Sequence, residues 1–278
     1  MKNSIRSPFL AAYLVAVCLL SPVTAEERPN FVWIVSEDNS IHYLDHFFPG
    51  GADTPNIKAL AEHGLTFDHA FSNASVCSVA RSTLATMCMT PRIGAQYHRR
   101  YVKATLPAGQ PTFYQAIQSH GYFTTNHTKE DFNFTSQLRG RFDKGRDWRG
   151  REHGQPFFHM ESLKQSHESS LHFPQSEFDG KTSVHNPTDI QLADCHPDTP
   201  MFRYTHARYL DNMLIIDDSV GAIVEKLKAD GLLEDTFIFY FGDHGGVLPR
   251  GKGYAYESGL HVPLVVRVPA NFRHLAGC

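Results

Sequence analysis

The stretch RPNFVWIVSED, residues 28–38, contains a continuous apolar run followed by two acidic residues. Five consecutive apolar residues, Phe31 to Val35, would present apolar side chains on both faces of a β-strand. Such a strand is typical of a parallel sheet that helices cover on both sides. A polar turn follows, in which Glu37 and Asp38 place two adjacent carboxylates directly after the strand. The stretch therefore predicts a buried strand with an acidic end.

A second apolar run, near the C-terminal end of the sequence, is also followed by an acidic turn. We expect a buried strand over 236–241, and the turn Gly242-Asp243-His244-Gly245 follows it. A third strand is predicted over 261–268. In open α/β sheets, ligands collect at the carboxyl ends of the strands. The two acidic turns are therefore expected to meet at one site.

Helical patterns lie between the strand candidates. The clearest follows Pro200, where apolar residues from Tyr209 to Leu227 are spaced by three and four and Gly231 marks the end. Shorter helices are expected from Pro55 to Gly64 with Thr54 as the N-cap, from Cys77, and over 112–120, with further strands over 65–71, 122–125 and 157–161. This alternation predicts the α/β class with a largely parallel sheet.

The composition is that of an ordinary globular protein. The chain has 278 residues, of which 41% are hydrophobic and 20% charged. Its formal net charge of −3 provides no global basic field, so we expect no nucleic-acid partner. The cysteines after residue 25 lie far apart, which does not suggest a disulfide framework.

The first 25 residues have the pattern of a secretory signal peptide. Lys2 and Arg6 precede a short apolar segment, and small residues up to Ala25 offer a cleavage site. The alternative is an N-terminal membrane anchor, although the apolar segment is short for a bilayer span. We therefore expect a mature chain over 26–278 that is secreted or periplasmic and is not stably inserted in a membrane after cleavage.

The acidic turns together suggest a metal site. Glu37, Asp38 and Asp243 would bring three carboxylates into one pocket, and His244 could be a fourth ligand. A hard divalent cation with oxygen ligands would relieve the repulsion, and Ca²⁺ or Mg²⁺ fits better than Zn²⁺. Acidic turns are also common without a metal, so these residues alone leave a purely structural alternative open.

The segment SNASVCSVARSTLATM, residues 72–87, suggests an anion site. Cys77 would lie at the start of a helix, where free N–H groups favour negative charge, and Arg81 adds a planar donor. The alternative is a buried structural thiol. Other candidates for a sulfuryl or phosphoryl pocket are Lys129, Asp131, His167 and Lys252. The arginine-rich segment 139–151 is either a solvated loop or a patch that attracts a polyanionic glycan.

In this order, the motifs resemble those of the sulfatase family. The similar segments are RPNFVWIVSED, DTPNIKALAEHGLTFDHAFSNASVCSVARSTLAT, GYFTTNHTKEDFNF, HPDTP, FIFYFGDHGG and GKGYAYESGLHVPLVV. They cover nearly everything from Arg28 to Pro269 except the loop-rich middle. The SEDNS and SHES segments look closest to the sulfoglucosamine sulfohydrolase-like branch, in which the scissile bond is N–S.

This resemblance implies a fold and a chemistry. The fold would be an alkaline-phosphatase-like α/β/α sandwich around a mixed, largely parallel sheet, with the family's C-terminal subdomain missing from this chain. A maturation enzyme would oxidise Cys77 to Cα-formylglycine, which would act on a sulfated saccharide with one bound Ca²⁺. The implied roles are catalytic for Cys77, Arg81, Lys129, His167 and Lys252, metal-binding for Glu37, Asp38, Asp243 and His244, and substrate-binding for Asp131 and Arg250.

The sequence departs from the family pattern at several positions. Val79 stands where the signature Cys-x-Pro/Ala-x-Arg has proline or alanine, and Met87 stands where glycine is usual. Asp131 stands where many members have histidine, and Glu37 replaces an aspartate. Two other functions therefore stay open: a non-catalytic binder of sulfated glycans, and a metal-dependent phosphatase or phosphodiesterase of the same superfamily.

Overall fold

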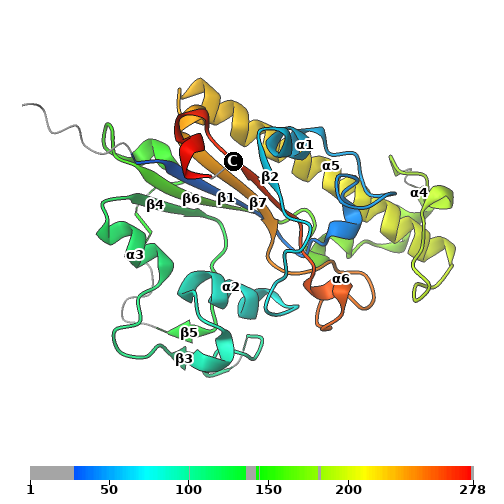
Figure 1. The fold of residues 1–278 in the computed structure, drawn as a ribbon. Coiled ribbons are helices and arrows are strands. Elements are labelled where there is room, and N and C mark those ends of the chain that lie inside the picture. Colours follow the sequence, from blue (N-terminus) through cyan, green and yellow to red (C-terminus); the bar gives the residue numbers. More distant parts are fainter. Residues whose placement is uncertain (1–27, 100, 136–141, 144, 181–182, 277–278) are drawn as a thin grey trace, which may run out of the picture.

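The computed structural model describes residues 28–276 except 100, 136–141, 144 and 181–182 (Figure 1). The expected signal peptide and part of the arginine-rich segment lie outside the described residues. The main sheet has the strand order β2-β8-β7-β1-β6-β4. Its strands are β1 (Asn30–Ser36), β2 (Gly64–Thr66), β4 (Phe123–His127), β6 (Phe157–Leu163), β7 (Thr236–Gly242) and β8 (Leu264–Arg267). β3 (Ala104–Thr105) and β5 (Phe134–Thr135) form a separate parallel pair.

The sheet is mixed, and its centre is parallel as expected. β1 runs parallel to β6 and to β7, and β4 runs parallel to β6. β8 is antiparallel to both β7 and β2. The helices are α1 (Pro55–Glu62), α2 (Cys77–Thr86), α3 (Phe113–Ser119), α4 (Gln175–Gly180), α5 (Pro200–Ala229) and α6 (Glu257–Leu260).

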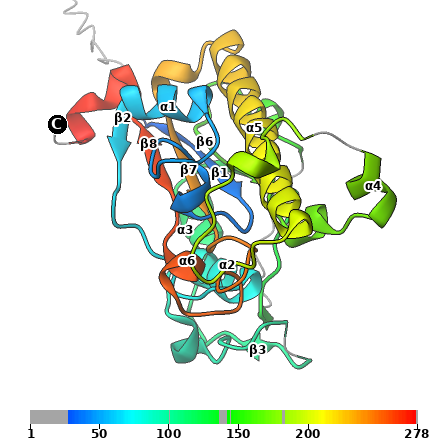
Figure 2. The same cartoon turned by 90° about the vertical axis from the view of Figure 1, so that its right-hand side faces the viewer.

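Helices cover both faces of the sheet, which confirms the α/β/α sandwich. Figures 1 and 2 show α1 and α5 on one face and α2 and α3 on the other. Val32 and Ile34 of β1 pack in the core with α1 and α5, whereas Val35 packs in the second core with Ala85 of α2 and Tyr114 of α3. The apolar character of both faces of β1 therefore reflects a second buried side, as the opening stretch predicts.

Two of the expected strands are shorter than predicted. β2 ends at Thr66 instead of continuing to Phe71, which makes only an isolated bridge to His261. β8 begins at Leu264, directly after Pro263, which has no N–H group to donate to a ladder.

Gly64 was expected to end α1, but it is the first residue of β2. A Cβ there would lie 1.9 Å from the carbonyl oxygen of Val266, so only glycine permits this close approach.

The N-terminus of α1 is capped by a distant residue. Thr54 occupies the N-cap position, but its side chain makes no capping hydrogen bond. Instead, Asp217 of α5 accepts hydrogen bonds from the backbone N–H groups of Asn56 (3.0 Å) and Ile57 (2.8 Å) and from the Asn56 side chain (2.8 Å). The expectation of a local threonine cap was therefore wrong in its hydrogen bonding, because a tertiary contact satisfies these donors.

This contact leads to a stability prediction. Asp217→Ala should destabilise the protein by about 2–3 kcal/mol, because it removes a cap and leaves buried donors unpaired. The neighbouring Asp218 is exposed, and Asp218→Ala should change the stability by less than about 0.5 kcal/mol. Urea unfolding of both variants measures this difference, and equal stability of the two would contradict the role assigned to Asp217.

Candidate active site

The two acidic turns meet because β1 and β7 are neighbours. Ser36 pairs with Gly242 at the last position of the ladder, so the turns after the two strands lie side by side. The backbone N–H of Asp38 donates to Oδ1 of Asp243 at 3.0 Å. Glu37, Asp38 and Asp243 are all buried. The expected convergence of distant carboxylates at the carboxyl ends of the strands is therefore found.

Backbone contacts fix the position of the first turn. Asp38 has a positive φ of 52°, which turns its backbone away from the direction of the strand. The Tyr209 hydroxyl on α5 donates to the carbonyl of Asp38, and the Ser166 hydroxyl donates to the carbonyl of Glu37. The long helix and the loop after β6 thus hold both carboxylates in place from outside the sheet.

His244 lies between the two aspartates. Its Nε2 atom is 2.9 Å from Oδ1 of Asp38 and 3.9 Å from Oδ1 of Asp243, and Nδ1 donates to the Gly245 carbonyl at 2.9 Å. Burial alone would lower the pKa of His244, but the charge of Asp243 and the hydrogen bond to Asp38 raise that pKa to about 10. In this arrangement the imidazolium carries a positive charge between the carboxylates.

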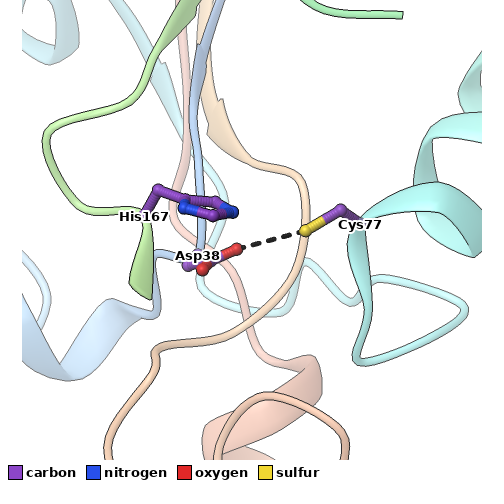
Figure 3. A group of neighbouring side chains, drawn as sticks. All are labelled: Asp38, Cys77 and His167. Atoms are coloured by element: carbon purple, nitrogen blue, oxygen red, sulfur yellow. Dashed lines mark hydrogen bonds between the residues drawn. The ribbon is translucent and has the colours of Figure 1, made fainter. Parts of the chain in front are cut away.

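Cys77 faces the same point from the opposite side. It is the first residue of α2 and is fully buried. Its Sγ atom lies 3.1 Å from Nε2 of His244 and 3.4 Å from Oδ1 of Asp38. Figure 3 shows the thiol pointing toward Asp38, with the His167 ring beside them. An atom attached to Cβ of residue 77 is therefore in contact with the acidic cluster.

Arg81 joins the helix to the carboxylates. One turn after Cys77 on α2, its Nε donates to Oδ2 of Asp243 at 2.9 Å, and Nη1 donates to the Ser162 hydroxyl at 3.1 Å. Nη2 lies 3.8 Å from Oε1 of Glu37 and has no hydrogen-bond partner among the described residues. Burial alone would lower the pKa of Arg81, but Asp243 and Glu37 raise it, so the guanidinium stays charged.

Two lysines pair with the remaining carboxylates. Lys129 Nζ lies 2.5 Å from Oε2 of Glu37, and Lys252 Nζ lies 2.8 Å from Oδ2 of Asp38 and 2.8 Å from Oε2 of Glu168. Each of the three buried carboxylates thus has a cationic side chain of its own. These cations offset the charges of the three carboxylates, so the mutual repulsion on which the predicted metal site was based does not by itself require a metal.

Of the other predicted site residues, two lie at the edge of the cluster and one lies apart. His167 Nε2 is 4.0 Å from Oε2 of Glu37. Asp131 is 3.9 Å from Lys129 and accepts two hydrogen bonds from Arg99, at 3.2 and 3.0 Å. Arg250 instead lies over the Tyr256 ring, 4.1 Å from its centroid, and lines a separate cavity.

Some contacts in the site were not predicted. Ser162 lies near the carboxyl end of β6, which neighbours β1, and Glu168 directly follows His167. The rule that ligands gather at strand ends could have indicated Ser162, since a strand was expected over 157–161. The pairing of Arg99 with Asp131 has no comparable signal in the sequence, because the loops that join them are irregular.

The clustered donor atoms are of the types that bind a divalent cation. Oδ1 of Asp38, Oδ1 of Asp243 and Sγ of Cys77 all lie within 3.9 Å of one atom, Nε2 of His244. The ligand atoms of Cys77, Asp243 and His244 lie within 4.8 Å of one another. The carboxylate oxygens suit Ca²⁺ or Mg²⁺, whereas the thiol and the imidazole also suit Zn²⁺. A cation at this point would replace the charge that the imidazolium of His244 carries.

The strand order and the acidic cluster at the strand ends define an alkaline-phosphatase-like α/β/α fold. A family model described as Sulfatase matches residues 29–144 and 139–276. The chain therefore belongs to the sulfatase family. Within the part of the chain that the structure describes, no helix has the length and apolar character needed to cross a membrane.

Several curated proteins are similar in sequence. An ulvan-active sulfatase of Formosa agariphila is 30% identical over 87% of this chain and 48% of that protein. An arylsulfatase of Hemicentrotus pulcherrimus is 27% identical over 87% of this chain and 54% of that protein. The N-sulphoglucosamine sulphohydrolase of Homo sapiens is 24% identical over 78% and 50%. The chain thus spans about half the length of these relatives.

Solved structures share the fold at low sequence identity. One, in complex with its substrate D-glucosamine-2-N,6-O-disulfate, has a TM-score of 0.62 and 16% identity over 87% of this chain and 71% of that chain. The phosphonate monoester hydrolase of Agrobacterium radiobacter has a TM-score of 0.56 and 19% identity over 87% and 68%. These similarities concern the fold alone.

Proposed function

We propose that residues 26–278 form the N-terminal portion of the catalytic domain of an exported sulfatase that hydrolyses sulfate esters or N-sulfate groups of a sulfated saccharide. The observation that carries this proposal is the position of residue 77. Its side chain lies within 3.4 Å of both Asp38 and His244, beside three buried carboxylates and a buried arginine. The family membership and the relatives that are named as sulfatases support the same reaction.

The nucleophile would come from Cys77. Conversion to Cα-formylglycine by a maturation enzyme would give this residue a hydrated aldehyde with two hydroxyl groups. One oxygen would attack sulfur as the bond from sulfur to the sugar oxygen or nitrogen breaks, and the second hydroxyl would then lose its proton, expel sulfate and restore the aldehyde. Bound Ca²⁺, held by Glu37, Asp38, Asp243 and His244, would act as a Lewis acid and favour the ionised oxygen. The start of α2 adds backbone N–H groups and a positive dipole end at the same point.

The cationic side chains would bind the sulfate group. Arg81 offers Nη2, which is buried and without a hydrogen-bond partner among the described residues. Lys129 and Lys252 are partly buried, and their Nζ atoms could contact sulfate oxygens as negative charge develops in the transition state. His167 lies at the edge of the cluster, 4.0 Å from Glu37, where it could give a proton to the leaving oxygen or nitrogen.

A non-catalytic glycan binder is the second candidate. Val79 supports it, because this buried residue of α2 departs from the signature that the maturation enzyme would read. In that case Cys77 would stay a thiol, and the cationic side chains would bind sulfate without cleaving it. The fold shared with a phosphonate monoester hydrolase makes phosphate esters a necessary comparison in any assay.

A substrate panel tests the proposed reaction. The protein, produced together with a formylglycine-generating enzyme, is incubated with sulfated mono- and oligosaccharides, with Ca²⁺ or with a chelator. We expect Ca²⁺-dependent release of inorganic sulfate and a much slower release of phosphate from phosphate monoesters. Binding of the saccharides without release of sulfate would favour the binder, and zinc-dependent release of phosphate would favour the phosphatase.

Calcium should also stabilise the folded protein. At a Ca²⁺ concentration of a hundred times Kd, binding to the native state adds about 2.7 kcal/mol, or roughly 5 °C in Tm for a domain of this size. Differential scanning fluorimetry with Ca²⁺ or chelator measures the shift. Asp243→Asn should abolish it, whereas Asp218→Asn, at an exposed position of α5, should leave it unchanged. An equal shift in both variants would contradict the proposed ligand.

A further inference from the structure

A cavity of about 390 Å³ lies next to the candidate active site and is not used by the proposed reaction. Its lining includes Tyr43, Cys195, His196, His206, Arg250 and Tyr256. Ligand pockets in proteins have volumes of about 300–1,000 Å³. The cavity is therefore large enough for a small organic group such as a sugar ring.

Two structural connections join the cavity to the cluster. Arg250 lines the cavity, and Lys252, two residues further along the same turn, contacts Asp38 at 2.8 Å. On the wall of the cavity, the Tyr43 ring packs against the Tyr209 ring, with 4.5 Å between centroids, and the Tyr209 hydroxyl binds the Asp38 carbonyl. The cavity is therefore separated from the backbone of Asp38 by two tyrosine side chains, Tyr43 and Tyr209.

The inner wall of the cavity carries neutral imidazoles. His206 is 8% exposed, and burial lowers its pKa to about 4. Burial also lowers the pKa of His196, whose Nε2 donates to the carbonyl of Pro249 at 3.4 Å. The Nδ1 atoms of both rings are buried and have no hydrogen-bond partner among the described residues. A neutral imidazole has one donor and one acceptor, which suits hydroxyl groups.

The outer wall of the cavity carries a cation and aromatic rings. The Arg250 guanidinium stacks on Tyr256 and forms no ion pair with any described residue. Glu257, which also lines the cavity, is instead paired with His261 at 2.7 Å. The Tyr256 ring is exposed, and the exposed ring of Tyr254, outside the cavity lining, lies 6.3 Å from it at an angle of 20°. An unpaired guanidinium beside aromatic faces suits an anionic group on a ring with an apolar face.

We infer that this cavity binds a second, anionic sugar ring of a sulfated oligosaccharide whose reacting sulfate lies at residue 77. Arg250 would bind the carboxylate or sulfate of that ring, Tyr256 would contact its face, and His196 and His206 would bind its hydroxyl groups. The inference rests on the proposed function. Arg250 would thus contact a neighbouring sugar and not the reacting sulfate. The protein would then bind sulfated oligosaccharides more tightly than sulfated monosaccharides.

Cys195 allows this inference to be tested by binding alone. It is an exposed free thiol in the lining of the cavity, whereas Cys77 is fully buried. In the Cys77→Ala variant, which should not release sulfate, the rate of Cys195 alkylation by iodoacetamide is measured by peptide mass spectrometry. A sulfated tetrasaccharide should slow the alkylation at least about fivefold, and the corresponding sulfated monosaccharide should not.

Two variants in the same background sharpen the result. Arg250→Gln should remove the protection, and Arg273→Gln, at an exposed position outside the cavity lining, should retain it. Equal alkylation with and without the tetrasaccharide would overturn the inference, as would equal protection by an uncharged tetrasaccharide. Sulfate release by the unsubstituted protein is measured separately. Sulfate release without protection of Cys195 would indicate a sulfatase that does not use this cavity. Protection of Cys195 without sulfate release would indicate a glycan binder that does use it.

Discussion

Replacing Arg81 with methionine is expected to destabilise the protein by about 3–5 kcal/mol and to abolish sulfate release. Arg81 is 1% exposed, and its guanidinium contacts Asp243 at 2.9 Å and Ser162 at 3.1 Å. Methionine would fill a similar volume but would leave the Asp243 carboxylate buried beside a neutral side chain. Removing one partner of a buried ion pair is costly for this reason.

The conservative substitution separates stability from activity. Arg81→Lys keeps the positive charge but loses the planar group that contacts Asp243 and Ser162 together, so sulfate release should still fall at least about 100-fold. The loss of stability should be clearly smaller than in Arg81→Met. Arg92→Met, at an exposed position beyond α2, serves as the control and should change neither quantity. A stable Arg81→Met variant with full activity would remove Arg81 from the account.

Replacing Cys77 with alanine is expected to lower sulfate release at least about 10³-fold, because the residue would supply the nucleophile. The fold should persist, because the substitution removes one sulfur atom at the first residue of α2. Ca²⁺ should still raise Tm, since its proposed ligands are unchanged. Cys88→Ala is the matched control: this cysteine is only partly buried, follows the end of α2 and should be dispensable.

Kinetics with a sulfated monosaccharide and an oligosaccharide would show the expected pattern. Cys77→Ala should lose activity toward both, with unchanged binding. If Cys77→Ala and Cys88→Ala released sulfate at the same rate as the unsubstituted protein, residue 77 would not be the nucleophile. The cationic side chains would then have to act on an oxygen from another source.

The central strands could be predicted because their signal is local. The apolar runs before Glu37 and before Asp243 each identify a strand that is buried on both faces, and the structure places the two side by side. Once they are parallel neighbours, the acidic turns must meet. The antiparallel direction of β8 has no such signal, because pairing depends on contacts between segments that are distant in the sequence.

The capping of α1 shows why local rules can fail. The pattern of Thr54 and Pro55 has the expected form, and the helix does begin at Pro55. The hydrogen bonds, however, come from Asp217, which is 161 residues from Asn56 in the chain. The ion pairs of Glu37, Asp38 and Asp243 also join segments that are distant in the chain. The sequence therefore predicted that the carboxylates cluster, but not which lysine or arginine pairs with each of them.

The candidate site residues also differ in how well the sequence predicts their positions. Residues on the ends of regular elements, such as Asp38, Cys77 and Asp243, lie where the strand and helix patterns predict. Residues in irregular loops are less predictable: Arg250 was expected to bind the substrate, and it lines a cavity apart from the acidic cluster, so its substrate-binding role stays a prediction. A two-residue offset from Lys252 in a turn is enough to direct a side chain toward a different site.

The mass of the peptide that contains residue 77 shows whether this residue is converted to the proposed nucleophile. The protein is produced in cells with a formylglycine-generating enzyme, and a reporter protein with a known modifiable cysteine confirms that this enzyme is active. We expect residue 77 to carry the aldehyde, detected also by its reaction with a hydrazide, while Cys88 remains a thiol. A thiol at residue 77 in every molecule, with the reporter fully converted, would exclude a formylglycine nucleophile in this protein.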